Sequence, residues 1–201
     1  MYHTAAVVLA AGQSRRMGAV NKLLIEINGV PMIRSTVSAC AAVCDAPVTV
    51  VTGYQAREIE SVLDGLDAHF VHNPDFGAGQ QGSVAAGLRA VAEAATTLVV
   101  LGDQPLLDAA ALRTFLDAHR VSSLGRISMP VKGVERGNPL AIPHTLKRAL
   151  LVDRANPGCR RFTRDNPDKV NPVPSEDPAY FTDLDTVEDL NLFQDEHSRP
   201  G

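Results

Sequence analysis

Apolar, β-branched runs alternate with longer helix-patterned stretches along the first 125 residues of the chain. The runs that predict buried strands are residues 5–10, 48–52, 69–71 and 97–101. The stretches that predict helices are residues 31–44, the segment around Ile59 and Leu63, residues 82–94, and a segment capped by Asp108. Strands that are apolar on both sides and followed by helices indicate a parallel sheet covered on both faces. With right-handed crossovers the pattern predicts a doubly wound α/β fold.

Beyond residue 125 the regular alternation fades, because eight prolines interrupt residues 130–178. We interpret this region as short strands and helices added to the same sheet, and not as a second domain. Residues 1–193 are therefore predicted to form a single domain. The polar residues 194–201 are predicted to form a flexible tail.

Composition narrows the class of protein. Hydrophobic residues make up 45% and charged residues 21% of the 201 residues, as in globular proteins. The net charge of −4 disfavours a nucleic-acid partner. No apolar run approaches the roughly 20 residues of a membrane span, and from the first residues we expect no signal peptide. The three cysteines fit a reducing compartment, so we expect a cytoplasmic enzyme or binding domain without a membrane partner.

The first predicted strand runs into a loop rich in small and basic residues, LAAGQSRRMG at residues 9–18, with Lys22 shortly after it. Such a loop lets backbone N–H groups approach phosphate oxygens while the cations neutralise the remaining charge. The spacing fits neither the P-loop motif nor G-x-G-x-x-G. The alternative interpretation is an ordinary glycine turn with a solvated basic face.

The fourth predicted strand ends in Gly102-Asp103-Gln104-Pro105. In a 3-2-1-4 strand order the first and fourth strands are neighbours at the switch point, where ligands bind beyond their carboxyl ends. Asp103 would then face the basic loop, where a carboxylate is favourable if it holds Mg²⁺ together with phosphate oxygens. The alternative is that Asp103 only caps the following turn.

Two acidic residues, Asp183 and Asp185, lie just before the last predicted helix. On an extended segment both side chains would point to the same side and would complete a metal site with Asp103. The spacing alone favours a different interpretation, in which Asp185 or Thr186 caps the helix and Glu188 interacts with the helix dipole.

These motifs together resemble the nucleotidyltransferases, whose fold is a Rossmann-like, mostly parallel sheet in three α/β/α layers (the nucleotide-diphospho-sugar transferase fold). The matching segments are LAAGQSRRMG, GDQP at residues 102–105, RGNP at 136–139 and DLDTVEDL at 183–190. The closest likeness is to the MobA/MocA-like proteins, and among them to the molybdenum cofactor cytidylyltransferases. Ala11 favours that branch, because its motif resembles LAAG whereas that of the guanylyl-transferring branch looks more like LAGG.

The resemblance implies a role for each matching position. The residues implied to bind the nucleotide are Leu9, Ala10, Ala11, Gly12, Ser14, Arg16, Lys22, Gly82, Ser83 and Asp103. Among them, Gly82 and Ser83 would contact the base. Catalysis falls on Arg16, Lys22 and Asp103. The implied ligands of Mg²⁺ are Asp103 and Asp185, with Asp185 preferred over Asp183. The acceptor would meet Arg136, Gly137 and Asn138.

The implied reaction is attack of the acceptor phosphate of molybdenum cofactor, a molybdopterin, on the α-phosphorus of CTP, with release of pyrophosphate. An acceptor phosphate is already anionic near neutral pH and needs no general base, which fits the absence of His from every motif. Catalysis would rest on positioning and on charge neutralisation by Mg²⁺, Lys22 and Arg16.

Two departures from the family pattern leave the acceptor open. Gln80 stands where Met is usual, and residues 156–160 read NPGCR where D-x-G-A-R is usual. The alternatives are the same chemistry with GTP or on another phosphate acceptor, such as a sugar or alcohol phosphate. A further alternative is a carrier or maturation factor that hands molybdenum cofactor to an apo-molybdoenzyme. Retention of Arg16, Lys22, Asp103 and Asp185 argues against a pure carrier, which needs no metal–triphosphate site.

Overall fold

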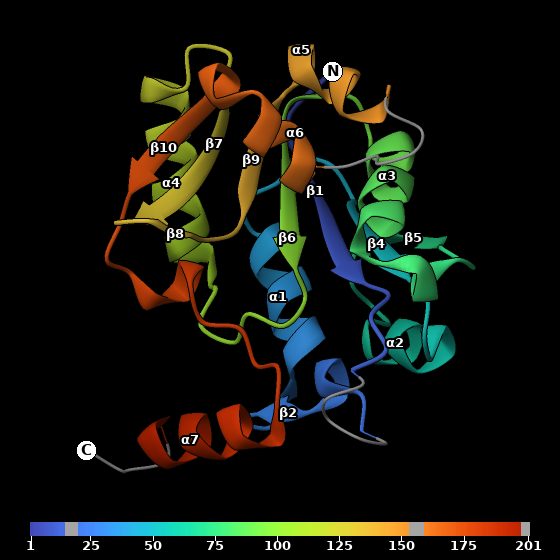
Figure 1. Ribbon diagram of the computed structural model, residues 1–201. Coiled ribbons are helices and arrows are strands. Elements are labelled where there is room, and N and C mark those ends of the chain that lie inside the picture. The colour runs from blue at the N-terminus through green and yellow to red at the C-terminus, as the bar shows by residue number, and fades with distance from the viewer. Residues whose placement is uncertain (15–19, 153–158, 198–201) are drawn as a thin grey trace.

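The computed structural model describes residues 1–14, 20–152 and 159–197. Within these residues an eight-stranded sheet runs through the centre of the molecule in the order β10-β7-β9-β6-β1-β4-β5, with β8 paired to β7 (Figure 1). Its strands are β1 (Tyr2–Ala10), β4 (Val48–Thr52), β5 (Ala68–His72), β6 (Ala94–Leu101), β7 (Ile127–Lys132), β8 (Glu135–Arg136), β9 (Leu140–Pro143) and β10 (Val170–Pro174). A separate antiparallel pair is formed by β2 (Glu26–Ile27) and β3 (Val30–Pro31).

The predicted order of the first four strands is confirmed. They are β1, β4, β5 and β6, and they lie parallel in the order β5-β4-β1-β6. The mostly parallel sheet is completed by β9, which pairs antiparallel with β6 and β7. The carboxyl ends of β1 and β6 lie side by side, because Leu9 pairs with Leu101 and the Gly102 N–H donates to the Leu9 carbonyl at 3.1 Å. This is the switch point at which a ligand is expected.

Helices cover both faces of the sheet, and alternate residues of β1 show how. The helices are α1 (Met32–Ala41), α2 (Ala56–Val62), α3 (Gln80–Ala90), α4 (Ala109–Ser122), α5 (His144–Lys147), α6 (Cys159–Asp165) and α7 (Val187–His197). Ala6 and Val8 join a core built with α1 and α4, whereas Val7 joins a core built with α3. The residues of β1 therefore face apolar layers on both sides, as the uninterrupted apolar run predicts.

The last helix, α7, lies away from the main layers, beside β2 (Figure 1). It is attached by a small apolar cluster in which Phe193 and the preceding Leu184 pack with Met32 at the start of α1. The helix continues to His197, past residue 193, where we expected the tail to begin. No helix among the described residues is long and apolar enough to cross a membrane.

Some predicted boundaries need correction. The helix expected over residues 82–94 is α3, which ends at Ala90, and β6 begins at Ala94. The reason is long-range pairing: β1 begins at Tyr2, which pairs with Ala94 and draws an alanine-rich segment into the sheet. The helix expected from Pro31 ends at Ala41, and Pro31 is its N-cap residue. The cap at Asp108 is confirmed, since its carboxylate accepts the Ala111 N–H at 2.8 Å.

Substitution of Gly87 by Ala should destabilise the protein, because α3 packs on the sheet at this glycine. A Cβ atom there would lie 2.3 Å from Val7 Cγ1 and 2.9 Å from Val51 Cγ2. Overpacking of this kind costs about 1–3 kcal/mol and outweighs the gain in helix propensity of about 1 kcal/mol. Urea unfolding should show a net loss of up to about 2 kcal/mol.

Gly82→Ala is the matched control in the same helix. The nearest atom to its added Cβ is Asn73 Nδ2 at 3.5 Å, an ordinary contact. The unfolding free energy of this variant should be unchanged or slightly raised. Equal losses at both positions would contradict close packing at Gly87 as the cause.

Candidate functional site

Two adjoining cavities open at the carboxyl ends of β1 and β6. The first has a volume of about 380 Å³ and lies between the loop after β1, the start of α3 and the turn after β6. The second, of about 870 Å³, extends toward β7–β9 and α6. The two share four lining residues, Leu9, Gly79, Gln80 and Leu101. A molecule in one cavity can therefore touch a molecule in the other.

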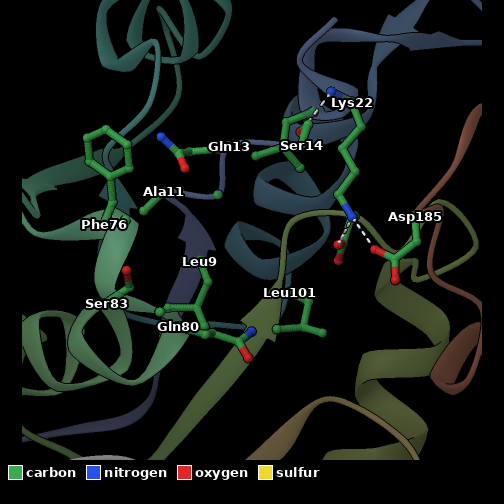
Figure 2. Close-up of a pocket in the computed structure, with 15 residues that line it drawn as sticks. Leu9, Ala11, Gln13, Ser14, Lys22, Phe76, Gln80, Ser83, Leu101 and Asp185 are labelled. Carbon is green, nitrogen blue, oxygen red and sulfur yellow. Dashed lines mark hydrogen bonds and ion pairs between the residues drawn. The ribbon is translucent and has the colours of Figure 1, made fainter. Parts of the chain in front are cut away.

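A lysine held between two carboxylates forms the polar end of the first cavity. Lys22 Nζ lies 2.5 Å from Asp103 Oδ2 and 2.7 Å from Asp185 Oδ1. Figure 2 shows Lys22 and Asp185 on one side of the cavity, opposite Ala11, Phe76 and Ser83. The Lys22 side chain is only 13% exposed. The cavity thus has one strongly charged end and one largely apolar end.

Local structure holds Lys22 in place. It begins a short 3-10 helix, Lys22–Leu24, whose N-cap Asn21 accepts the Leu23 N–H at 3.2 Å. Ser14, in the left-handed region with φ of 49°, accepts the Lys22 N–H through its hydroxyl at 3.2 Å. The loop after β1 and the lysine are therefore connected, as their nearness in the sequence indicates.

The late acidic segment reaches the site through one backbone contact and one apolar contact. The Leu184 N–H donates to the Asp103 carbonyl at 3.1 Å, and the Leu184 side chain is buried against Met32. Asp185 follows and turns its carboxylate toward Lys22. Two carboxylates 82 positions apart in the sequence therefore meet at one cation.

The helix cap that the spacing favoured is also present, but Thr186 forms it. The Thr186 hydroxyl accepts the Asp189 N–H at 3.1 Å, and the Asp189 carboxylate accepts the Thr186 N–H at 2.7 Å. This is a reciprocal capping box with Asp in the usual place of Glu or Gln. Since Thr186 and Asp189 supply the cap, the Asp185 carboxylate lines the first cavity. Asp183 lines the second cavity, so the two acids serve different sides of the site.

The charges of the cluster depend on one another. Burial by itself would lower the pKa of Lys22, but the charges and hydrogen bonds of Asp103 and Asp185 outweigh it, so the pKa is raised. Lys22 is therefore a cation throughout the neutral range. The pKa of Asp183 is raised, mainly because the carboxyl group is partly buried and also because the negative charges of Asp103 and Asp185 lie nearby.

The carboxylate pair fits a divalent metal ion that arrives with phosphates. Asp103 Oδ1 is buried and has no hydrogen-bond partner among the residues that the structure describes, so one of its oxygens is available as a ligand. Within the described part of the chain no three His, Cys, Asp or Glu side chains gather into a metal cluster. Mg²⁺ is commonly bound by one or two carboxylates together with substrate phosphates and water, and does not need a full protein cage. Asp103 and Asp185 match that donor set.

The opposite end of the first cavity is formed by small and apolar groups. Leu9 and Ala11 come from β1 and its loop, Phe76 from the short helix Phe76–Ala78, and Ser83 from α3. Ser83 is 4% exposed, and its hydroxyl accepts a hydrogen bond from Asn73 Nδ2 at 2.9 Å. This end offers space for a flat ring and a hydroxyl to orient it.

The second cavity is bordered by the segment Arg136–Asn138. Gly137 is needed there, because a Cβ atom would lie 2.5 Å from the Tyr180 carbonyl oxygen. Three arginines, Arg136, Arg160 and Arg164, line the cavity together with two acids, Glu135 and Asp183, so its formal charge is positive by one. Cys159 also lines it, but burial raises the pKa of this thiol to about 12, so it remains protonated. The cavity suits an anionic molecule.

Most of the residues singled out from the sequence meet at these cavities. The first cavity is lined by Leu9, Ala11, Gly12, Ser14, Lys22, Ser83, Asp103 and Asp185. The second is lined by Arg136, Gly137 and Asn138. Ala10 and Gly82 line neither: the Ala10 side chain belongs to the core on the α1 side, and Gly82 adjoins Asn73. Arg16 lies outside the described residues.

The sequence reasoning missed several residues at the site. In the first cavity they are Gln13, Leu23, Phe76, Gly77, Gly79 and Leu101. Asn73, which lies behind Ser83, was also missed. The available signal was the glycine-rich approach to α3, where Gly79 has φ of 117° directly before the helix. Only glycine adopts this conformation without strain.

A doubly wound sheet with charged and apolar ends of one cavity at its switch point is typical of nucleotide-binding α/β proteins. The chain belongs to the family described as the MobA-like NTP transferase domain, which matches residues 6–170. A solved nucleotidyl transferase from Methanothermobacter superimposes with a TM-score of 0.81 at 28% identity, over 96% of this chain and 97% of that one. Fold and family together identify the protein as a nucleotidyltransferase.

Curated relatives carry different activities in their names. A nicotine blue oxidoreductase from Paenarthrobacter nicotinovorans is 29% identical over 92% of this chain and 93% of that protein. A 2-C-methyl-D-erythritol 4-phosphate cytidylyltransferase from Shouchella clausii is 32% identical over 73% of this chain and 66% of that protein. A "Probable molybdenum cofactor guanylyltransferase" from Natronomonas pharaonis is 33% identical over 51% of this chain and 50% of that protein. The names of these relatives do not agree on one nucleotide or on one acceptor.

Proposed function

We propose that the protein transfers CMP from CTP to the phosphate of a molybdopterin-type acceptor, releasing pyrophosphate, with Mg²⁺ held by Asp103 and Asp185. The observation that carries the proposal is the division of the first cavity. One end holds Lys22 between two carboxylates, and the other has room for a base against Ala11 and Ser83. A nucleoside triphosphate placed along the cavity would match both ends.

The chain's own groups would act by holding charge and geometry. When bound, Mg²⁺ neutralises triphosphate oxygens and acts as a Lewis acid at the reacting phosphate. Lys22 would stabilise the charge that develops on the leaving pyrophosphate. No histidine lines either cavity in the described residues, which fits an acceptor phosphate that attacks without a general base.

The preference for CTP rests on the small apolar end of the first cavity. Ala11 and Ser83 leave room there that suits a pyrimidine. In the presence of Mg²⁺, CTP at about 100 times its Kd should stabilise the fold by about 2.7 kcal/mol, and GTP at the same concentration by less. Differential scanning fluorimetry with each nucleotide measures this, and an EDTA series tests the need for the metal. A larger melting shift with GTP would overturn the choice of base.

The acceptor assignment rests on the excess of arginines and the size of the second cavity, which Arg136 and Asn138 line. The competing acceptor is another phosphate, such as a sugar or alcohol phosphate. Pyrophosphate release should be followed with CTP, Mg²⁺ and each acceptor in turn, molybdopterin included. Release with a sugar phosphate but not with molybdopterin would replace the proposed acceptor and leave the chemistry in place.

A carrier that delivers the cofactor to an apo-molybdoenzyme is the second candidate function. The paired carboxylates favour the enzyme, as does the buried Asp103 Oδ1, which has no partner in the described part of the chain, because a carrier needs no metal–triphosphate site. A redox reaction, which the name of the nicotine blue oxidoreductase indicates for that relative, likewise does not require a pair of metal-binding carboxylates. Molybdopterin binding without pyrophosphate release with any nucleotide would favour the carrier.

A further inference from the structure

A buried amide lies directly behind the base end of the first cavity. Asn73 follows β5, and its backbone N–H donates to the Thr52 carbonyl at 2.8 Å. Its side-chain Nδ2 donates to Ser83 Oγ at 2.9 Å. Asn73 is 7% exposed and lines neither cavity, so in the described structure it reaches them only through Ser83.

The orientation of this amide is fixed by a second hydrogen bond. Asn73 Oδ1 accepts the Asp75 N–H at 3.1 Å, so the carbonyl side of the amide is already engaged. The side that faces Ser83 is therefore the NH₂ group, which can only donate. Ser83 Oγ accepts the hydrogen bond from Asn73, so the hydroxyl hydrogen of Ser83 can donate a hydrogen bond to another group.

That hydrogen has no acceptor within the described residues. Some helical hydroxyls donate to a carbonyl four residues earlier, as Thr36 does to Met32 at 3.2 Å and Thr114 to Ala110 at 3.0 Å, but Ser83 makes no such bond. Ser83 lines the first cavity, so a bound molecule can supply the missing acceptor. A hydroxyl in this state donates into the cavity.

We infer that Asn73 is a positioning residue for base selection, because it makes Ser83 a hydrogen-bond donor toward the base. The inference rests on the proposed nucleotide site and adds the reason for its choice of base. The ring nitrogen separates the bases: N3 of cytosine is an acceptor, whereas uracil and guanine carry an N–H at the corresponding position. The O2 carbonyl is an acceptor in cytosine and uracil alike. An N–H facing Ser83 would leave the hydroxyl hydrogen without an acceptor, which disfavours that base by about 10- to 100-fold.

CTP and UTP form the decisive comparison, since they have the same size and triphosphate. Asn73→Asp replaces the NH₂ group by an oxygen that accepts, so the Ser83 hydrogen turns away from the cavity. The ratio of kcat/KM for CTP to that for UTP should fall at least about tenfold in this variant. Equilibrium binding by isothermal titration calorimetry should show the same change in ratio, independently of turnover.

Ser83→Ala and the double variant Asn73→Asp/Ser83→Ala show whether Asn73 acts through Ser83. Once Ser83 is replaced, the Asn73 substitution should leave the CTP/UTP ratio unchanged, so the effects of the two substitutions are not additive. Circular dichroism and melting temperature check that each variant folds. Equal losses for CTP and UTP in Asn73→Asp, or a ratio that still changes in the Ser83→Ala background, would overturn the inference.

An error in the proposed function would show in the wild-type protein, and not in the Asn73 variants. If the wild-type protein prefers GTP or UTP, the assignment of CTP is wrong. Asn73→Asp would still change the CTP/UTP ratio if the amide sets the hydroxyl's direction. A preference for CTP that Asn73→Asp leaves intact would sink the inference alone.

Discussion

Asp103→Asn should reduce nucleotide transfer on the order of 10³-fold, which corresponds to about 4 kcal/mol of activation free energy. The substitution preserves the shape of the side chain but removes one of two negative charges from the proposed metal site. It also removes the charge that lies 2.5 Å from Lys22 Nζ. Pyrophosphate release at saturating Mg²⁺ measures the effect, and circular dichroism verifies the fold.

Asp183→Asn is the matched control for this loss. Asp183 lies in the same acidic segment as Asp185 but lines the second cavity, away from the proposed metal site, so its substitution should reduce the transfer rate far less and should leave the dependence of the rate on Mg²⁺ unchanged. Asp185→Asn should act in the same direction as Asp103→Asn but more weakly, because a water molecule can replace a ligand at a partly exposed position. Near-normal pyrophosphate release from a folded Asp103→Asn variant would contradict the proposed metal site, which is the strongest argument for this mechanism.

The centre of the fold could be predicted because its signals are local. Each of the first four strands is a short apolar run, and a parallel sheet covered on both faces requires such runs. The order β5-β4-β1-β6 then placed the loop after β1 beside Asp103. The overlong helix at residues 82–94 shows the limit of local signals, since pairing of Ala94 with Tyr2 outweighs helix propensity.

The candidate site was only partly predictable, because several of its positions are set by distant contacts. The spacing of the late acids allowed either a helix cap or a metal ligand. The structure supplies a cap from Thr186 and Asp189 and brings Asp185 to the site through the contact of Leu184 with Asp103. Asn73 left no signal of its own, because the role that we infer for it depends on its hydrogen bond to Ser83, ten positions away on another element. No propensity or local spacing expresses such contacts.

Lys22→Met should raise the activation free energy by about 2–4 kcal/mol, which lowers turnover on the order of 30- to 1,000-fold. In the proposed mechanism the ammonium stabilises charge on the leaving pyrophosphate, and this interaction would be stronger in the transition state than in the ground state. The loss should therefore appear mainly in kcat, measured by pyrophosphate release at saturating CTP and Mg²⁺. Lys132→Met is the matched control, because Lys132 forms an exposed ion pair with Glu176 that touches neither cavity.

Melting curves of the same variant separate this role from a merely structural one. Without the ammonium, Asp103 and Asp185 repel each other at close range, so the metal-free Lys22→Met protein should melt at a lower temperature than the wild type. Mg²⁺ alone should then raise the melting temperature of the variant more than that of the wild type, because the ion neutralises carboxylates that Lys22 otherwise neutralises. Unchanged turnover would make Lys22 a structural counterion, and an absent response to Mg²⁺ would contradict the carboxylate pair as a metal site.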